Sequence, residues 1–177
     1  MIRYLLIAFS VSLFGTAGEA AEIPRFSSWV NDYAGVLTSK DRAALEETLA
    51  AYENETTHQI AILTVASLED ESIESFSLKV ANAWGLGHKR IDNGVLITLA
   101  MSEHAVRIEL GTGMNRYVSN SDARGIVDST MLPAFRRGDI AGGLKRGVER
   151  LLEACRAYKV PKPADAGKSV SRPSSNR

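Results

Sequence analysis

Two short apolar runs with a helical stripe between them constrain the fold of this chain most strongly. Residues 59–65 and 95–100 are almost entirely apolar and rich in branched side chains, which is typical of strands covered on both faces. Between them, apolar residues recur at helical spacing from Ile73 to Trp84 and stop at the helix breaker Gly85. A strand, helix, strand order predicts a right-handed crossover between parallel strands.

A third strand is predicted directly after the second apolar run. Residues 106–110 alternate strictly between apolar and charged side chains, which indicates one buried and one wetter face. Only residues 101–105 separate this segment from the run before it, so we expect an antiparallel hairpin. The sheet is therefore predicted to be small and mixed, with a parallel crossover and one antiparallel pair.

Helices are predicted on both sides of this sheet. Thr38 is a candidate N-cap for a helix over residues 39–54. Further along the chain, Asn120 is a candidate cap for a helix that reaches Pro133, and Asp139 for a final amphipathic helix. Together the segments predict a three-layer α/β/α sandwich of about 140 residues, a size that buries enough surface to fold unaided.

Composition excludes several classes of protein. The 177 residues include 21 Lys and Arg and 21 Asp and Glu, so the chain has no positive field to hold nucleic acid. Cys155 is the single cysteine, so an intrachain disulfide and a thiolate zinc site are excluded. Its place on the apolar stripe of the final helix predicts that it packs in the core.

The two ends of the chain differ from the middle. Residues 1–20 show a basic start, a short apolar run and small residues, the pattern of a secretory signal cleaved after Ala20. The apolar run is too short to span a membrane, and we expect no transmembrane anchor after cleavage. Residues 159–177 are basic and poor in large apolar groups, which predicts a disordered tail. The folded domain is expected over residues 21–158, in the periplasm or outside the cell.

The candidate site residues lie in two loops that are predicted to converge, one at the start of the second apolar run and one at the end of the alternating strand. Asp92 and Asn93 carry hard oxygen donors that suit Ca²⁺ or Mg²⁺. The alternative is that the same residues, followed by Gly94, form a tight turn. Motif spacing alone leaves both interpretations open.

The facing loop, Gly111-Thr112-Gly113, lacks the third glycine of a dinucleotide-binding loop, so NAD binding is excluded. With Arg116 it could offer backbone N–H groups and a guanidinium to a phosphate. The alternative is a plain strand-to-loop turn. The three histidines have no adjacent Ser or Cys nucleophile in a strained turn, and we expect each to lie at the surface. They are His58, His88 and His104.

Several motifs in order resemble the TPM domain family. They are residues 30–38 (VNDYAGVLT), 92–96 (DNGVL), 107–113 (RIELGTG), 133–139 (PAFRRGD) and 142–148 (GGLKRGV). The resemblance covers about residues 28–153. It implies an α/β/α fold in exported or lumen-facing proteins, divalent-cation binding in some members, acid phosphatase activity in a chloroplast-lumen member and accessory roles in others.

Carried over residue by residue, the resemblance makes Asp32, Asp92 and Asn93 the candidate cation ligands. Relatives commonly carry acidic residues where this sequence has Asn115 and Asn120. Two lost carboxylates weaken attraction for a dication, so we expect weak calcium or magnesium binding or none.

The favoured function is an exported binding or accessory module of the cell envelope, with an envelope protein or complex as its partner. The alternative is a metal-assisted acid phosphatase that hydrolyses phosphomonoesters. Both hypotheses share one spatial expectation, that Asp32 folds back to meet Asp92 and Gly111-Thr112-Gly113 in a single pocket.

Overall fold

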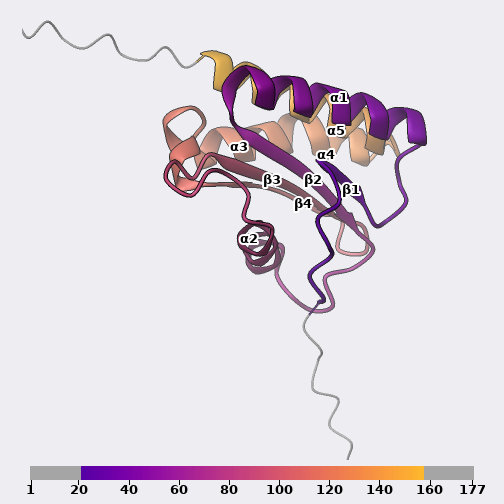
Figure 1. The fold of residues 1–177 in the computed structure, drawn as a ribbon. Helices are drawn as coiled ribbons and strands as arrows, with labels where there is room; N and C mark the ends of the chain where they lie inside the picture. The colour runs from indigo at the N-terminus through magenta and orange to yellow at the C-terminus, as the bar shows by residue number, and fades with distance from the viewer. Residues whose placement is uncertain (1–20, 158–177) are drawn as a thin grey trace, which may run out of the picture.

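A four-stranded mixed sheet forms the centre of the molecule. The computed structural model describes residues 21–157 (Figure 1). The strands lie in the order β1-β2-β3-β4, and their bounds are β1 Val30–Asp32, β2 Gln59–Val65, β3 Gly94–Ala100 and β4 Ala105–Leu110. The first three are parallel, and β4 pairs antiparallel with β3. The predicted mixed sheet is confirmed. Strand β1 was not predicted, because three residues are too few to show the alternating pattern of a strand.

Helices cover both faces of the sheet (Figure 1). The crossover helix α2 (Ile73–Trp84) packs on one face. The other face is covered by α1 (Ser39–Thr56) and α5 (Ile140–Ala157). Successive residues of β2 alternate between these two layers, since Ile60 and Ile62 join one core and Ala61 and Leu63 the other. Both faces of β2 and β3 are therefore apolar, which explains their nearly continuous apolar sequence and confirms the predicted three layers.

The segment between β4 and α5 is a short 3₁₀ helix followed by one irregular helical rod over residues 120–135. A short 3₁₀ helix, η1 (Thr112–Arg116), is followed by α3 (Asn120–Ile126), the π-helical segment η2 (Val127–Met131) and α4 (Leu132–Phe135). The predicted helix up to Pro133 thus forms, with a π-helical turn inside it. The rod packs beside α5, on the same face of the sheet.

Helix caps agree with two of the three sequence predictions. The side chain of Thr38 accepts from the backbone of Asp41 at 3.1 Å, and that of Asp139 accepts from Gly142 at 3.0 Å. The prediction for Asn120 is wrong, because Ser119 is the N-cap of α3 and exchanges hydrogen bonds with Asp122. A serine with an acid three residues later forms a reciprocal capping box, which is a stronger signal than one asparagine.

The predicted signal segment and the whole of the predicted tail lie outside the described residues. Within residues 21–157, no helix is both long enough and apolar enough to cross a membrane.

Candidate functional site

The two glycine-containing loops meet as predicted, at the amino ends of β2 and β3. Gly111 donates its N–H to the carbonyl of Gly94 at 2.8 Å, and Gly113 donates to the carbonyl of Asp92 at 2.9 Å. A Cβ on Gly113 would collide with the carbonyl oxygen of Ile91. These glycines are therefore needed for close approach of two backbones.

Asp92 holds the two loops together through its side chain. Its Oδ2 accepts the backbone N–H of Thr112 at 2.6 Å and the hydroxyl of the same residue at 2.8 Å. The backbone of Asp92 is left-handed, with φ of 50°. Aspartate tolerates this conformation better than most residues. The geometry agrees with the tight-turn interpretation of this segment.

Asn93 is buried and fully engaged, with 1% of its surface exposed. Its Oδ1 accepts the backbone N–H of His88 at 2.9 Å, and its Nδ2 donates to the carbonyl of Thr57 at 2.8 Å. Because the one oxygen of this amide faces a donor, it does not fit the role of a cation ligand that the sequence predicted.

Backbone N–H groups of the predicted phosphate loop are used inside the fold. Besides Gly111 and Gly113, Thr112 donates to Asp92, and Met114 donates to the carbonyl of Gly111 at 2.9 Å. The exposed guanidinium of Arg116 lies 5.9 Å from the ring centre of its neighbour Tyr117. Four successive engaged amides leave no row of donors for a phosphate, so the geometry favours the strand-to-loop turn.

Asp32 organises a different loop, at the carboxyl end of β1. Its Oδ1 accepts the backbone N–H of Val36 at 3.1 Å and the hydroxyl of Thr64, while Oδ2 accepts the backbone N–H of Leu37 at 2.9 Å. Both carboxylate oxygens therefore fix the turn that leads from β1 into α1.

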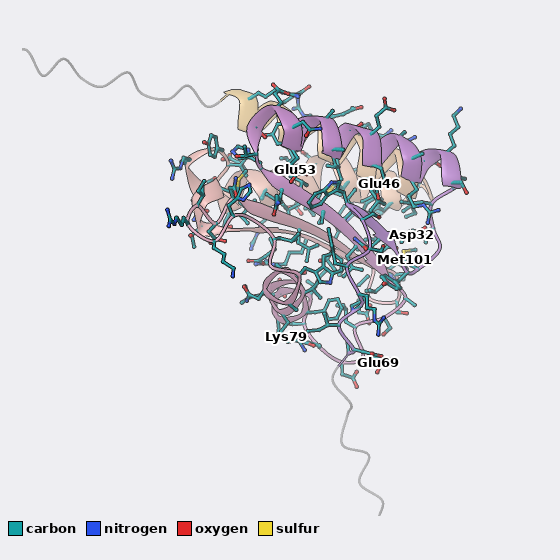
Figure 2. All side chains as sticks on the ribbon, in the orientation of Figure 1. Asp32, Glu46, Glu53, Glu69, Lys79 and Met101 are labelled. Carbon is teal, nitrogen blue, oxygen red and sulfur yellow. The ribbon has the colours of Figure 1, made fainter. Side chains whose placement is uncertain are left out.

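The predicted single pocket around Asp32 and Asp92 is wrong. Asp32 is in register with Thr64 near the carboxyl end of β2, whereas Gly94 is in register with Gln59 at the amino end. At about 3.3 Å per residue, those five positions amount to about 16 Å along the strand. Figure 2 shows Asp32 at the same end of the sheet as Met101, which follows β3. The two aspartates are separated because β1 runs parallel to β2 and β3. The carboxyl end of β1, which carries Asp32, therefore lies at the other end of the sheet from the amino end of β3, which follows Asp92.

A buried histidine near the converging loops is a feature that the sequence prediction missed. His58 is only 6% exposed, so the prediction of a surface position is wrong. Its Nδ1 lies 3.0 Å from the hydroxyl of Tyr52, and its ring centre lies 4.5 Å from that of Tyr117. Burial, followed by the nearby charge of Arg116, lowers the pKa of His58. The available signal was Tyr52 on the apolar stripe of α1, since a buried phenol needs a polar partner.

Cys155 lies in the core, as predicted, with 4% of its surface exposed. Burial raises the pKa of its thiol, which keeps it protonated and unreactive. Within residues 21–157, no three His, Cys, Asp or Glu side chains gather in a group that could hold a metal ion.

The family of the chain follows from a match that spans most of the fold. A TPM domain matches residues 30–154, from β1 to the last turns of α5. The chain belongs to the TPM domain family. Among curated proteins, none matches the sequence.

Three solved structures of bacterial proteins share this fold. The N-terminal domain of a protein from P. gingivalis is 32% identical, with a TM-score of 0.68, covering 71% of this chain and 80% of that one. The N-terminal domain of the cg2496 protein from Corynebacterium glutamicum is 18% identical, with a TM-score of 0.59 and coverages of 89% and 96%. The BA42 protein from the psychrophile Bizionia argentinensis is 22% identical, with a TM-score of 0.58 and coverages of 69% and 83%. The last two similarities concern the fold alone.

Proposed function

We propose that this TPM domain is exported and acts in the cell envelope as a binding or accessory module. One observation carries the proposal: Asp32 and Asp92, the acids best placed in the sequence for catalysis, lie at opposite ends of the sheet. Each carboxylate accepts hydrogen bonds from a neighbouring loop. These acids therefore shape loops, and a binding module needs no further catalytic group.

Export is proposed from the sequence of residues 1–20. The test is to express the full chain, separate the cell envelope and exported fractions from the cytoplasm, and measure the mass of the protein in each. We expect a chain that begins at Ala21 outside the cytoplasm. Ala20→Phe, with a bulky residue at the cleavage position, should leave the chain uncleaved, and Glu19→Gln should be processed normally. A full-length chain confined to the cytoplasm would overturn the proposal.

A divalent cation would have to bind at one end of the sheet alone. Affinity for Ca²⁺ or Mg²⁺ depends on the number of carboxylates, and each end offers one of the two predicted acids. We therefore propose that any cation site in this domain is weak. Thermal melting with and without millimolar Ca²⁺ checks this, since a ligand selective for the folded state raises the melting temperature. A shift of several degrees that disappears in Asp92→Asn or Asp32→Asn would contradict it.

The alternative function, acid phosphatase, is tested directly. Purified wild-type chain, Asp32→Asn and Asp92→Asn are compared for hydrolysis of an aryl phosphate from pH 4.5 to 7.5, with Ca²⁺ or Mg²⁺ added. Background rates in all three are the expected result. Hydrolysis by the wild type that falls more than tenfold in a variant that remains folded would replace the binding module with an enzyme.

A further inference from the structure

The outer edge of β4 carries backbone groups that no other strand uses. The bond from Gly111 to Gly94 sets the antiparallel alternation, so Ala105, Arg107 and Glu109 direct their backbone groups toward β3. The N–H and C=O groups of the residues between them point away from the sheet. Those residues are Val106, Ile108 and Leu110, and within residues 21–157 no other segment pairs with them.

The opposite edge of the sheet is closed, which makes the open edge at β4 distinctive. β1 is only three residues long. The outward N–H of Val30 donates to the side chain of Glu46 at 2.8 Å. Short edge strands and side chains that cap them are common protections against unwanted pairing. β4 has neither protection over its six residues.

A groove of about 610 Å³ runs along this open edge. One wall contains Glu74 of α2, and the floor contains residues 104–108, which include most of β4. The other wall belongs to α3 and η2, with Ala123, Val127 and Asp128 among its residues. A sheet edge between two helical walls has the shape that accepts one added strand.

We propose that this groove binds an extended peptide segment of an envelope partner, which pairs with β4 as a fifth strand. The inference rests on the proposed function as a binding module and names where and how it binds. The outward backbone groups of β4 supply the hydrogen bonds to the peptide. The two walls of the groove contact alternate side chains of the peptide.

The walls favour a single extended chain over a second copy of this domain. In edge-to-edge pairing of two β4 strands, the elements that flank the groove in each copy, α2, α3 and η2, would have to fit against those of the other. A lone peptide strand carries no such covering helices. The volume of the groove suits a strand of a few residues.

The two walls also define the side-chain pattern of the peptide. Ala123 and Val127, buried at the base of one wall, favour small apolar side chains on that face of the peptide. On the side of the groove that carries Glu74, the side chain of Arg107 extends from β4, bonds Glu109 at 2.6 Å and lies 3.8 Å from Glu74, which favours uncharged polar peptide side chains there.

Charge complementarity adds one acidic residue to this pattern. Arg124 is exposed and lines the groove, and no ion pair engages it in the part of the chain that the structure describes. An acidic side chain on the apolar face of the peptide, beyond the small residues, would form an ion pair with Arg124. The partner segment is therefore alternating, with small apolar residues and one acid on the same face.

The test uses two blocked synthetic peptides, Thr-Val-Thr-Val-Thr-Glu and Glu-Thr-Val-Thr-Val-Thr, which cover both strand directions. Each is titrated into the isotopically labelled full chain and followed by NMR. We expect chemical shift changes along β4, and hydrogen exchange at the amides of Val106, Ile108 and Leu110 that slows at least tenfold at saturation. Replacing Glu with Lys in the peptide should weaken binding at least threefold.

Two sets of controls separate strand addition from nonspecific contact. Peptides N-methylated only on the Thr positions or only on the Val positions block one edge of the strand each, and only one of the two series should lose binding. In the protein, Asp128→Trp fills the groove and should weaken binding at least tenfold. Ser129 follows Asp128 in the chain but lines a different pocket, so the Ser129→Trp protein should bind the peptides as the wild type does.

The outcomes distinguish this inference from the function on which it rests. Equal loss in both N-methyl series, binding unaffected by Asp128→Trp, no binding by either peptide, or self-association through β4 would overturn strand addition. In those cases the binding module stands as long as export occurs and phosphate hydrolysis stays at background. Hydrolysis that depends on Asp32 or Asp92 would overturn the module whatever the peptides do.

Discussion

Asp92 and Thr112, twenty positions apart in the chain, are joined by two hydrogen bonds to one carboxylate oxygen, at 2.6 and 2.8 Å. The pair fastens the loop before β3 to the 3₁₀ turn after β4. Asp92, which the sequence predicted as a cation ligand, therefore stabilises the contact between these two loops. The loops on this side of the sheet are consequently held by side-chain and backbone hydrogen bonds to each other.

Substitutions of Asp92 should therefore change stability in a fixed order. Asp92→Ala removes both bonds, worth about 1 kcal/mol together, and places alanine in a left-handed backbone that costs about 1 kcal/mol more. We expect a loss of about 2 kcal/mol in the free energy of unfolding. Asp92→Asn keeps an acceptor and the tolerated backbone, so it should lose less than half of that. Urea denaturation measures the free energy of unfolding of both variants. Equal losses would contradict a role of the Asp92 side chain in holding the two loops together.

Gly113 should tolerate no side chain. A Cβ there meets the carbonyl oxygen of Ile91, which is backbone and cannot rotate away. We expect Gly113→Ala to destabilise the fold by about 3 kcal/mol. Gly125→Ala is the matched control, because nothing lies within 4 Å of its Cβ position in α3. That variant should gain about 0.5 kcal/mol from helix propensity. Thermal or urea unfolding of the two variants checks the contrast.

Asp32 and Asp92 should act independently. Sites more than about 10 Å apart without shared partners have additive effects on stability. The double variant Asp32→Asn/Asp92→Asn should therefore lose the sum of the two single losses within about 0.5 kcal/mol, with or without Ca²⁺. A larger coupling that appears only with Ca²⁺ would indicate a cation shared by the two carboxylates, contrary to the separation described above.

His58 should make the stability of the domain fall under mild acid. Its pKa is lowered in the folded state by burial and by Arg116, while the unfolded chain has the ordinary value of 6.5. Above that pH the residue is neutral in both states and contributes no pH dependence. As pH falls through 6.5 toward the folded pKa, the unfolded state takes up the proton first, so stability is lost. The slope approaches about 1.4 kcal/mol per pH unit.

His58→Gln removes this titration and keeps a polar partner for the hydroxyl of Tyr52. Its free energy of unfolding should vary less between pH 7.5 and pH 5.5 than that of the wild type, even if it is lower throughout. Urea denaturation at several pH values gives both slopes. Identical slopes would show that the acid sensitivity has another source.

Hydrogen exchange along β4 should alternate in the free protein. The amides of Arg107 and Glu109 face β3 and should exchange at least ten times more slowly than those of Val106 and Ile108, which point away from it. NMR exchange of the full chain without any peptide measures this. Uniform protection along the strand would mean that another segment already pairs with the edge.

The local pattern of the sequence determined which segments form secondary structure and which faces they bury. Residues 59–65, 73–84 and 95–100 have the predicted identities as strand, helix and strand, because periodicity and helix breakers act over a few residues. The hairpin also followed from the sequence, since a four-residue connection leaves only antiparallel pairing. The convergence of the loops at Asp92 and Gly113 was a direct consequence of that hairpin.

Only the tertiary structure decided where Asp32 lies and what its carboxylate does. β1 is three residues long, and its direction depends on packing against β2 and α1, which no local pattern records. Parallel pairing sends Asp32 to the far end of the sheet from Asp92. Likewise, His58 is buried because α1 and the loop after β4 close over it, a contact between distant segments. Periodicity reports on neighbours in the chain, whereas a site depends on neighbours in space, and these are fixed only once the strands are paired and oriented.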